Sequence, residues 1–187
     1  MSSHVSLRDH YLIAMPGLAD ANFERALTYV CQHDEDGAMG LVVNRPGQMH
    51  LRDLFKQLDL TVPGELLDEQ VLLQGGPISP ERGFVLHRGG GDWDATTPVT
   101  ADIHLTHSRD VLAAISNGRG PTQFLVALGY AGWSAGQLEQ ELAGNVWLNV
   151  PADADVMFHH PPEARLDAAV GLLGIQLDQL GGDIGHA

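Results

Sequence analysis

The sequence predicts an α+β fold on three observations. Short apolar runs closed by Gly, Pro or Asp predict about eight β-strands. Roughly four or five stretches repeat apolar residues at helical spacing, which predicts short helices. The strand and helix signals follow one another irregularly, which favours α+β over a doubly wound α/β sheet.

The expected strands are bounded by turn residues. They cover residues 10–15, 26–32, 38–44, 71–74, 83–87, 124–128, 146–150 and 155–159, and residues 99–105 are expected to be extended. The polar turn at residues 33–37 predicts that the second and third strands form a hairpin.

Helices are expected over four stretches, two of which have clear end signals. Ser108 is a typical N-cap, and Asn117-Gly118 is a typical helix end. Pro161-Pro162 is typical of a helix start. The expected helices cover residues 51–58, 108–117, 134–143 and a stretch that begins at residue 162.

The 187 residues show no repeat, linker or shift of composition, so we expect one domain, 1–187. Residues 1–9 lack the apolar stretch of a signal peptide and are expected to be a flexible N-terminus. No apolar window approaches the ~18 residues that span a membrane. A single cysteine, Cys31, excludes an intramolecular disulfide and fits a reducing compartment. By elimination, we expect a cytoplasmic protein.

The chain is strongly acidic. The 24 Asp and Glu outnumber the 10 Lys and Arg, which gives a formal charge of −14. A surface of that sign repels phosphate backbones and anionic lipids, and the basic residues are scattered. We therefore expect no direct nucleic-acid binding and no membrane binding. A protein partner is expected instead, and a homo-oligomer is an open alternative.

The segment Gly132-Trp133-Ser134-Ala135-Gly136 matches the G-x-S-x-G nucleophile elbow of serine hydrolases. The alternative is that Ser134 caps a helix, with Gln137 completing a capping box. Too few residues follow Ser134 for the strand–helix units of a hydrolase, so we favour the cap and expect no enzyme activity. The triad partners that the hydrolase alternative requires are Asp153 or Asp155 with His159, His160 or His186.

The histidines and the cysteine do not predict a metal centre or a cofactor. His104 and His107 lie at an expected strand-to-helix junction, where they do not share one helix face. His159 and His160 are neighbours in an expected strand, so their side chains point to opposite faces. Cys31 lies in an apolar strand, which indicates a small buried side chain.

Polar residues and glycines gather at the ends of several expected strands, where loops often line clefts. Arg45 and Arg82 could hold an anionic ligand, although pairing with carboxylates such as Asp36 or Glu81 is the favoured alternative. The candidate ligand-binding residues are Asn44, Arg45, Gly75, Gly76, Arg82, His87 and Gln137.

Several segments in fixed order resemble the bacterial AlgH/YqgE family, from about residue 10 to the last residue. The segments are His10 to Pro16 with Asp20, Asn22 and Phe23, then Gly37 to Pro46, Gly75 to Pro77, Arg82 to His87, Gly129 to Trp133, Gly136 to Glu139, Asn145 to Trp147 and Gly185 to Ala187. One departure is Arg165-Leu166, where relatives often carry Arg-Trp.

The resemblance implies a bent mixed β-sheet that closes into a pseudo-barrel, with short helices packed outside. It also implies an association with alginate control and with transcriptional regulation. It brings no catalytic residue and no cofactor, and the family pattern does not fix serine at position 134.

Three functions follow from these expectations. The leading hypothesis is a non-enzymatic regulator that acts indirectly on transcription through protein contacts. The alternative is a small-ligand sensor, and the remote alternative is a serine hydrolase that uses Ser134.

Overall fold

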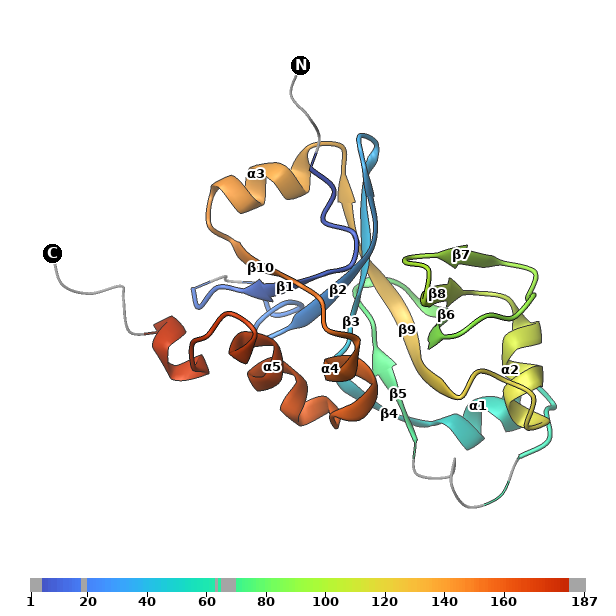
Figure 1. The fold of residues 1–187 in the computed structure, drawn as a ribbon. Coiled ribbons are helices and arrows are strands. Elements are labelled where there is room, and N and C mark those ends of the chain that lie inside the picture. Colours follow the sequence, from blue (N-terminus) through green and yellow to red (C-terminus); the bar gives the residue numbers. More distant parts are fainter. Residues whose placement is uncertain (1–4, 18–19, 63, 65–69, 182–187) are drawn as a thin grey trace, which may run out of the picture. The chain divides into compact units, whose positions relative to one another are not determined.

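The computed structural model describes residues 5–17, 20–62, 64 and 70–181 (Figure 1). It divides into two compact units. The first unit combines residues 1–45 and 131–187, and the second unit is residues 46–130. The described helices include none that is long and apolar enough to cross a membrane.

An antiparallel sheet forms the first unit, in the order β10-β1-β2-β3-β9. Residues 131–134 of β9 belong to this unit and pair with residues 37–40 of β3. A bulge between Val30 and Gln32 bends β2, because one extra residue increases the local twist. The strands are β1 (His10–Ala14), β2 (Leu27–Asp34), β3 (Gly37–Val42), β9 (Gln123–Ser134) and β10 (Trp147–Pro151).

Short helices complete the first unit. Its apolar core packs Leu12 and Val30 against Trp133, Leu138 and Trp147. Helix α5 contacts β1, β2 and α4. The helices are α3 (Gln137–Ala143), α4 (Ala154–His159), α5 (Pro162–Gly171) and the 3-10 turn η2 (Leu177–Gly181).

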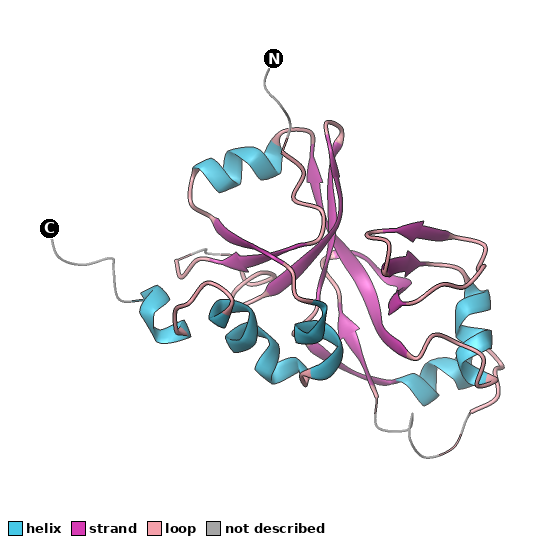
Figure 2. Cartoon of the chain, viewed as in Figure 1, coloured by secondary structure: helices cyan, strands magenta, loops and turns pink. Residues whose placement is uncertain are grey.

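The second unit is a mixed sheet with two helices (Figure 2). Strands β9, β6, β8 and β7 are antiparallel neighbours, whereas β5 pairs with β9 in parallel and β4 pairs with β5. Leu51, Phe55, Leu72, Val111 and Val126 form its core. The elements are β4 (Pro46–His50), α1 (Leu51–Gln57), β5 (Val71–Gln74), β6 (Ile78–Arg88), β7 (Thr96–Pro98), β8 (Ile103–Thr106) and α2 (Arg109–Ser116).

The α+β class, the mixed sheet and the short helices are confirmed. The hairpin of β2 and β3 is confirmed, as are the ends of α2 at Ser108 and Asn117. The strand expected at 155–159 is wrong, because that stretch is helix α4. Strands β4 and β7 were not predicted.

Two further expectations meet the structure in part. Of the N-terminal residues 1–9, the structure describes 5–9, where Leu7 is buried and its amide N–H donates to His33 Nδ1 at 2.8 Å. The single-domain expectation stays a prediction.

Candidate functional site

The candidate ligand-binding residues divide between the two units. Asn44, Arg45 and Gln137 belong to the first unit. The remaining candidates, Gly75, Gly76, Arg82 and His87, belong to the second unit. Each unit is therefore described by itself.

Asn44 and Arg45 hold the loop that connects β1 to β2. The Asn44 side chain accepts from Leu27 N at 2.8 Å and donates to the Arg25 carbonyl at 2.9 Å. Arg45 donates to three carbonyl oxygens of the same loop, which belong to Ala21, Asn22 and Glu24. The Arg45 guanidinium therefore binds backbone carbonyls. The favoured prediction was that it pairs with a carboxylate such as Asp36.

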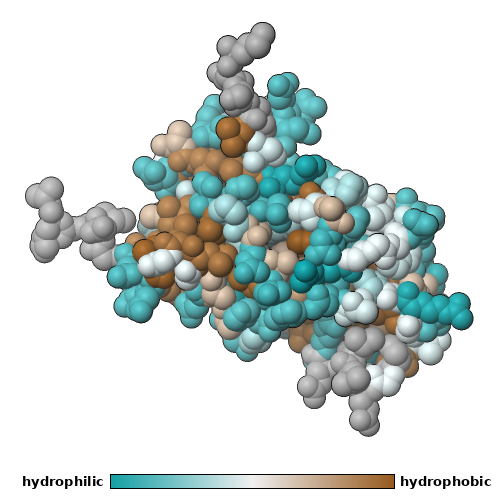
Figure 3. Space-filling model, viewed as in Figure 1, coloured by the Kyte–Doolittle hydropathy of each residue, from teal (hydrophilic) through white to brown (hydrophobic). Residues whose placement is uncertain are grey.

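A groove of about 410 Å³ lies beside this loop, between the end of β1, helix α5 and η2. We call it the α5 groove. Its apolar walls come from Ile13, Met15, Leu166, Leu177 and Leu180. Figure 3 shows apolar side chains gathered over β1 and α5 on this face of the unit.

The α5 groove continues into a second hollow of about 260 Å³ that reaches Asn44 and Arg45. Glu24, Arg25, Leu166 and Leu177 line both hollows. The structure thus places two of the predicted residues, Asn44 and Arg45, beside one groove. The sequence analysis missed the rest of its lining, for which the three-residue spacing of Leu177 and Leu180 was the available signal.

In the second unit, Gly75 and Gly76 lie against another stretch of backbone. A Cβ on Gly75 would lie 2.3 Å from the Gly129 carbonyl oxygen, and one on Gly129 would lie 2.4 Å from the Gly76 carbonyl oxygen. Such distances leave no room for a side chain. Close packing of β5 against β9 therefore explains Gly75, whereas Gly76 has a φ of 153°, a conformation that favours glycine.

Arg82 is not paired with Glu81. Its Nη2 lies 3.2 Å from His107 Nδ1, and its guanidinium lies 5.3 Å from the centre of the Phe84 ring. The ring contact is a cation–π interaction, which attaches the side chain to the sheet face.

His87 is fully buried and belongs to a hydrogen-bonded chain. Its Nε2 lies 2.8 Å from Thr106 Oγ1, which lies 2.8 Å from Thr96 Oγ1. Thr96 donates to the Trp93 carbonyl at 3.0 Å, while His87 Nδ1 lies 3.3 Å from the Gly89 carbonyl. Both carbonyls at the ends of the chain only accept.

Counting protons assigns the tautomer of His87. The four contacts need four protons, whereas two hydroxyls and a neutral imidazole supply three. The longest contact, to the Gly89 carbonyl, is the one left without a proton, so neutral His87 carries its proton on Nε2. Burial lowers the pKa of His87 and outweighs the Gly89 carbonyl, which raises it; the nearby His104, whose ring centre lies 5.7 Å away, also lowers it.

His87 should make the protein less stable in acid. Because its pKa is lower in the folded state, the unfolded chain binds the proton more readily once the pH falls below roughly 6.5. Stability from this group is complete above that pH and is lost as the pH falls towards the folded pKa. We expect His87→Gln to remove this part of the acid sensitivity, measured as the free energy of unfolding at pH 7.5 and pH 5.

The exposed His160 supplies the control for His87. His160→Gln should retain the acid sensitivity of the wild-type chain. Equal pH profiles of stability for the wild-type chain and His87→Gln would contradict a lowered pKa of His87 in the folded state.

A family model described as AlgH-like matches residues 11–178. The chain belongs to the AlgH-like family. A protein of Chromobacterium violaceum named "UPF0301 protein" is 50% identical over 183 residues, covering 98% of both chains. A protein of the same name from Saccharophagus degradans is 52% identical over 183 residues, covering 98% of this chain and 90% of its own.

Solved structures agree with this assignment. The solution structure of the AlgH protein from Pseudomonas aeruginosa matches with a TM-score of 0.81 at 45% identity, over 100% of this chain and 99% of its own. A crystal structure of a Corynebacterium diphtheriae protein matches with a TM-score of 0.67 at 18% identity, over 89% of this chain and 86% of its own, which supports the fold alone. The resemblance found in the sequence is confirmed.

In this AlgH-like chain, Ser134 is the last residue of β9 rather than a helix cap. The N-cap of α3 is Gly136, in the left-handed conformation with φ 75°. Gln137 Oε1 accepts from Ser134 N at 2.9 Å and from Ser134 Oγ at 3.3 Å. Half of the expected capping box is therefore present, although Ser134 does not occupy the cap position.

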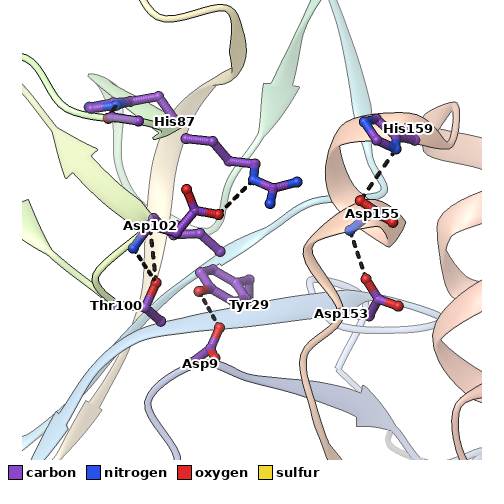
Figure 4. Close-up of polar contacts among 11 residues, drawn as sticks. Asp9, Tyr29, His87, Thr100, Asp102, Asp153, Asp155 and His159 are labelled. Atoms are coloured by element: carbon purple, nitrogen blue, oxygen red, sulfur yellow. Dashed lines mark hydrogen bonds and ion pairs between the residues drawn. The ribbon is translucent and has the colours of Figure 1, made fainter.

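The hydroxyl of Ser134 donates to Gln137 rather than to a histidine. Among the proposed triad partners, Asp155 Oδ1 lies 3.3 Å from His159 Nδ1 on exposed turns of α4, and Asp153 accepts from Asp155 N (Figure 4). His186 lies outside the described residues. This geometry explains Asp153 as the cap of α4 and Asp155 as a neighbour of His159 one turn away.

These contacts predict unequal effects at Ser134 and Gln137. Gln137→Ala should lower the free energy of unfolding by about 1 kcal/mol, because it removes the acceptor for Ser134 N. Ser134→Ala should change it by less than about 0.5 kcal/mol and should leave any ester hydrolysis unchanged. Loss of esterase turnover in purified Ser134→Ala would contradict this and support the hydrolase.

The other reactive side chains have local explanations. Cys31 is fully buried, as predicted, and burial raises the pKa of its thiol. His104 stacks on His87 and His107 contacts Arg82. Within the described residues, no three His, Cys, Asp or Glu side chains come together as metal ligands.

A histidine–carboxylate pair escaped the sequence analysis. His33 Nδ1 accepts from Leu7 N, so its proton lies on Nε2, 2.7 Å from Glu139 Oε1. Because the backbone amide occupies Nδ1, we interpret the pair as a clasp that fixes the N-terminal segment and α3 to the sheet.

Proposed function

We propose that this AlgH-like protein is a cytoplasmic, non-enzymatic regulator that acts on transcription indirectly, through contact with a protein partner. The observation that carries the proposal is the α5 groove, a hollow on the first unit in which the partly exposed Leu177 and Leu180 lie beside the buried Ile13 and Leu166, with charged residues in the same lining. Apolar side chains grouped in a surface hollow with polar surroundings are typical of an interaction site. A second copy of the chain is an alternative partner, which sedimentation of the purified protein would reveal.

Charge supports an indirect role. A net charge of −14 opposes direct contact with a phosphate backbone, so a protein partner is the favoured route to transcriptional control. Tight, sequence-selective DNA binding by the purified protein in a gel shift would contradict this part of the proposal.

The test is capture of partners from the native cell by crosslinking, with groove variants of the full chain. Leu177→Ser with Leu180→Ser removes apolar surface from η2 and should abolish capture of a specific partner. Leu172→Ser is the matched control, because Leu172 is 40% exposed and does not line the groove. Identical captured proteins for all three chains, or none above background, would refute the proposal.

A small-ligand sensor is the second candidate, because about 410 Å³ lies within the range of small-molecule sites. A metabolite at 100 times its Kd would stabilise the protein by ~2.7 kcal/mol. A thermal-shift screen on the wild-type chain and the Leu177→Ser, Leu180→Ser variant would show this as a rise in Tm confined to the wild-type chain.

A further inference from the structure

We infer that the α5 groove binds a partner segment that combines an apolar side chain with flanking lysines or arginines. This inference rests on the proposed function and adds the chemistry of the partner to it. Three observations carry it: the distribution of charge between the units, the carboxylates around the groove, and the apolar walls.

The first observation is that the negative charge is concentrated on the unit that holds the groove. Fourteen acidic residues against four basic ones give the first unit a formal charge of −10. Ten acidic against six basic residues give the second unit −4. A cationic segment is therefore attracted to the first unit more strongly, and such a field raises the rate of encounter.

The second observation concerns the rim of the groove. Glu24 and Asp178 line the α5 groove, while Glu163 and Asp167 line the adjoining second hollow. All four carboxylates are exposed, and none of them forms an ion pair with a described residue. Two arginines, Arg25 and Arg45, also line the second hollow, but the Arg45 guanidinium is held on three loop carbonyls. The rim thus offers more acceptors than the chain itself satisfies.

Two of these carboxylates repel each other. Glu163 and Asp167 are exposed and lie one helical turn apart on α5. Like charges at this spacing destabilise a helix slightly. A lysine or arginine of the partner placed near both would replace this repulsion with attraction.

The third observation is the apolar interior. Three leucines from α5 and η2, Leu166, Leu177 and Leu180, line the hollow together with Ile13 and Met15. Burial of an apolar side chain there supplies the affinity, while the rim charges select the flanking residues. An acidic segment would instead meet four carboxylates in the two hollows, where, among the described lining residues, Arg25 is the arginine that is not held on loop carbonyls.

The test uses the purified full chain and three labelled peptides of equal length. The first has leucines spaced three and four apart with lysines between them. The second replaces each lysine by glutamate, and the third replaces each leucine by serine. Fluorescence anisotropy at physiological salt should show binding of the first peptide and at least about tenfold weaker binding of the other two.

Matched variants separate the groove from general electrostatic attraction. Glu163→Gln with Asp167→Asn should weaken binding about fivefold, since exposed ion pairs contribute modestly to affinity. Asp34→Asn with Glu35→Gln removes the same charge from the exposed β2–β3 turn and should change binding less than about twofold. Leu177→Ser should weaken it about tenfold.

Several results would overturn the inference. They are equal weakening by the two charge pairs, undiminished binding of the serine peptide, and absence of binding by the lysine–leucine peptide. If these occur while the Leu177→Ser, Leu180→Ser chain still loses its native partner, the partner chemistry is wrong and the proposed function stands. If the peptides behave as expected while native capture is unchanged, the proposed function is wrong instead.

Discussion

Replacement of Gly129 by alanine is expected to lower the free energy of unfolding by about 2–5 kcal/mol, from two separate effects. Gly129 has φ 76°, where a side chain costs roughly 1–2 kcal/mol. The new Cβ would also lie 2.4 Å from the Gly76 carbonyl oxygen and 3.2 Å from that of Ile78. Both contacts are with backbone, so relief requires β9 to move, at a cost of about 1–3 kcal/mol.

Two other glycines of the second unit separate these effects. Gly118 has φ 72° with no atom within 4 Å of an added Cβ, so Gly118→Ala should cost only the roughly 1–2 kcal/mol of the left-handed conformation. Gly75 has no positive φ, but its Cβ would lie 2.3 Å from the Gly129 carbonyl oxygen, so Gly75→Ala tests the close approach alone. Urea unfolding should rank Gly129→Ala as the most destabilising. A cost no greater than that of Gly118→Ala would show that β9 adjusts freely.

The glycines show why part of the candidate site could not be assigned from the sequence. Gly75 and Gly76 follow an expected strand, which is also where ligand-binding glycines occur. Their partner is Gly129, more than fifty residues later in the chain, and the sequence does not state that the two backbones meet. A glycine at the end of a strand can indicate that another group lies close to it, but it does not show whether that group is a ligand or another part of the backbone.

The fold was predicted well where an apolar run and its end signals agree. Ser108 and Asn117 bound α2 as expected, and the polar turn after β2 produces the expected hairpin. The stretch 155–159 was misassigned because a run of five residues does not distinguish a strand from one turn of helix. The Asp153 side chain accepts a hydrogen bond from Asp155 N and so caps the N-terminus of α4, which favours the helix.

The groove could not be predicted because its lining comes from elements that meet only in the folded chain. The polar clasp of His33 and Glu139 joins residues 106 positions apart. Arg45 donates to backbone carbonyls, and every residue has one, so the sequence does not indicate which of them Arg45 binds.

The net charge, in contrast, follows directly from the sequence. The structure adds that most of this negative charge belongs to the unit that carries the groove.

Arg165 is the second position where a large loss of stability is expected. Its side chain is buried on α5, where Nε donates to the His160 carbonyl at 2.9 Å and Nη1 donates to the Val43 carbonyl at 2.7 Å. Burial lowers the pKa of Arg165 to about 10, so it remains charged near pH 7. Each such charge-assisted hydrogen bond contributes about 1.5–3 kcal/mol. Arg165→Met loses these hydrogen bonds but also removes the cost of burying a cation, which offsets part of the lost stability. We therefore expect Arg165→Met to be destabilised by about 3 kcal/mol.

Two further variants decide whether the shape or the charge of Arg165 matters. Arg165→Lys keeps the cation but lacks the planar fork that reaches two carbonyls, so it should be destabilised to a similar degree as Arg165→Met. Arg8→Met removes an exposed arginine of the same unit and should change stability by less than about 0.5 kcal/mol. Full stability of Arg165→Lys would show that charge alone suffices.

The position of Arg165 connects this prediction to the groove. The next residue, Leu166, lines the groove, and the Val43 carbonyl that Arg165 binds directly precedes Asn44 and Arg45. Arg165 therefore fixes α5 to the end of β3 at the point where one wall of the groove begins. At a temperature where Arg165→Met is still folded, we expect weaker binding of the lysine–leucine peptide, although no groove-lining residue has changed. Unaltered affinity in a destabilised variant would mean that the wall is held by its apolar contacts alone.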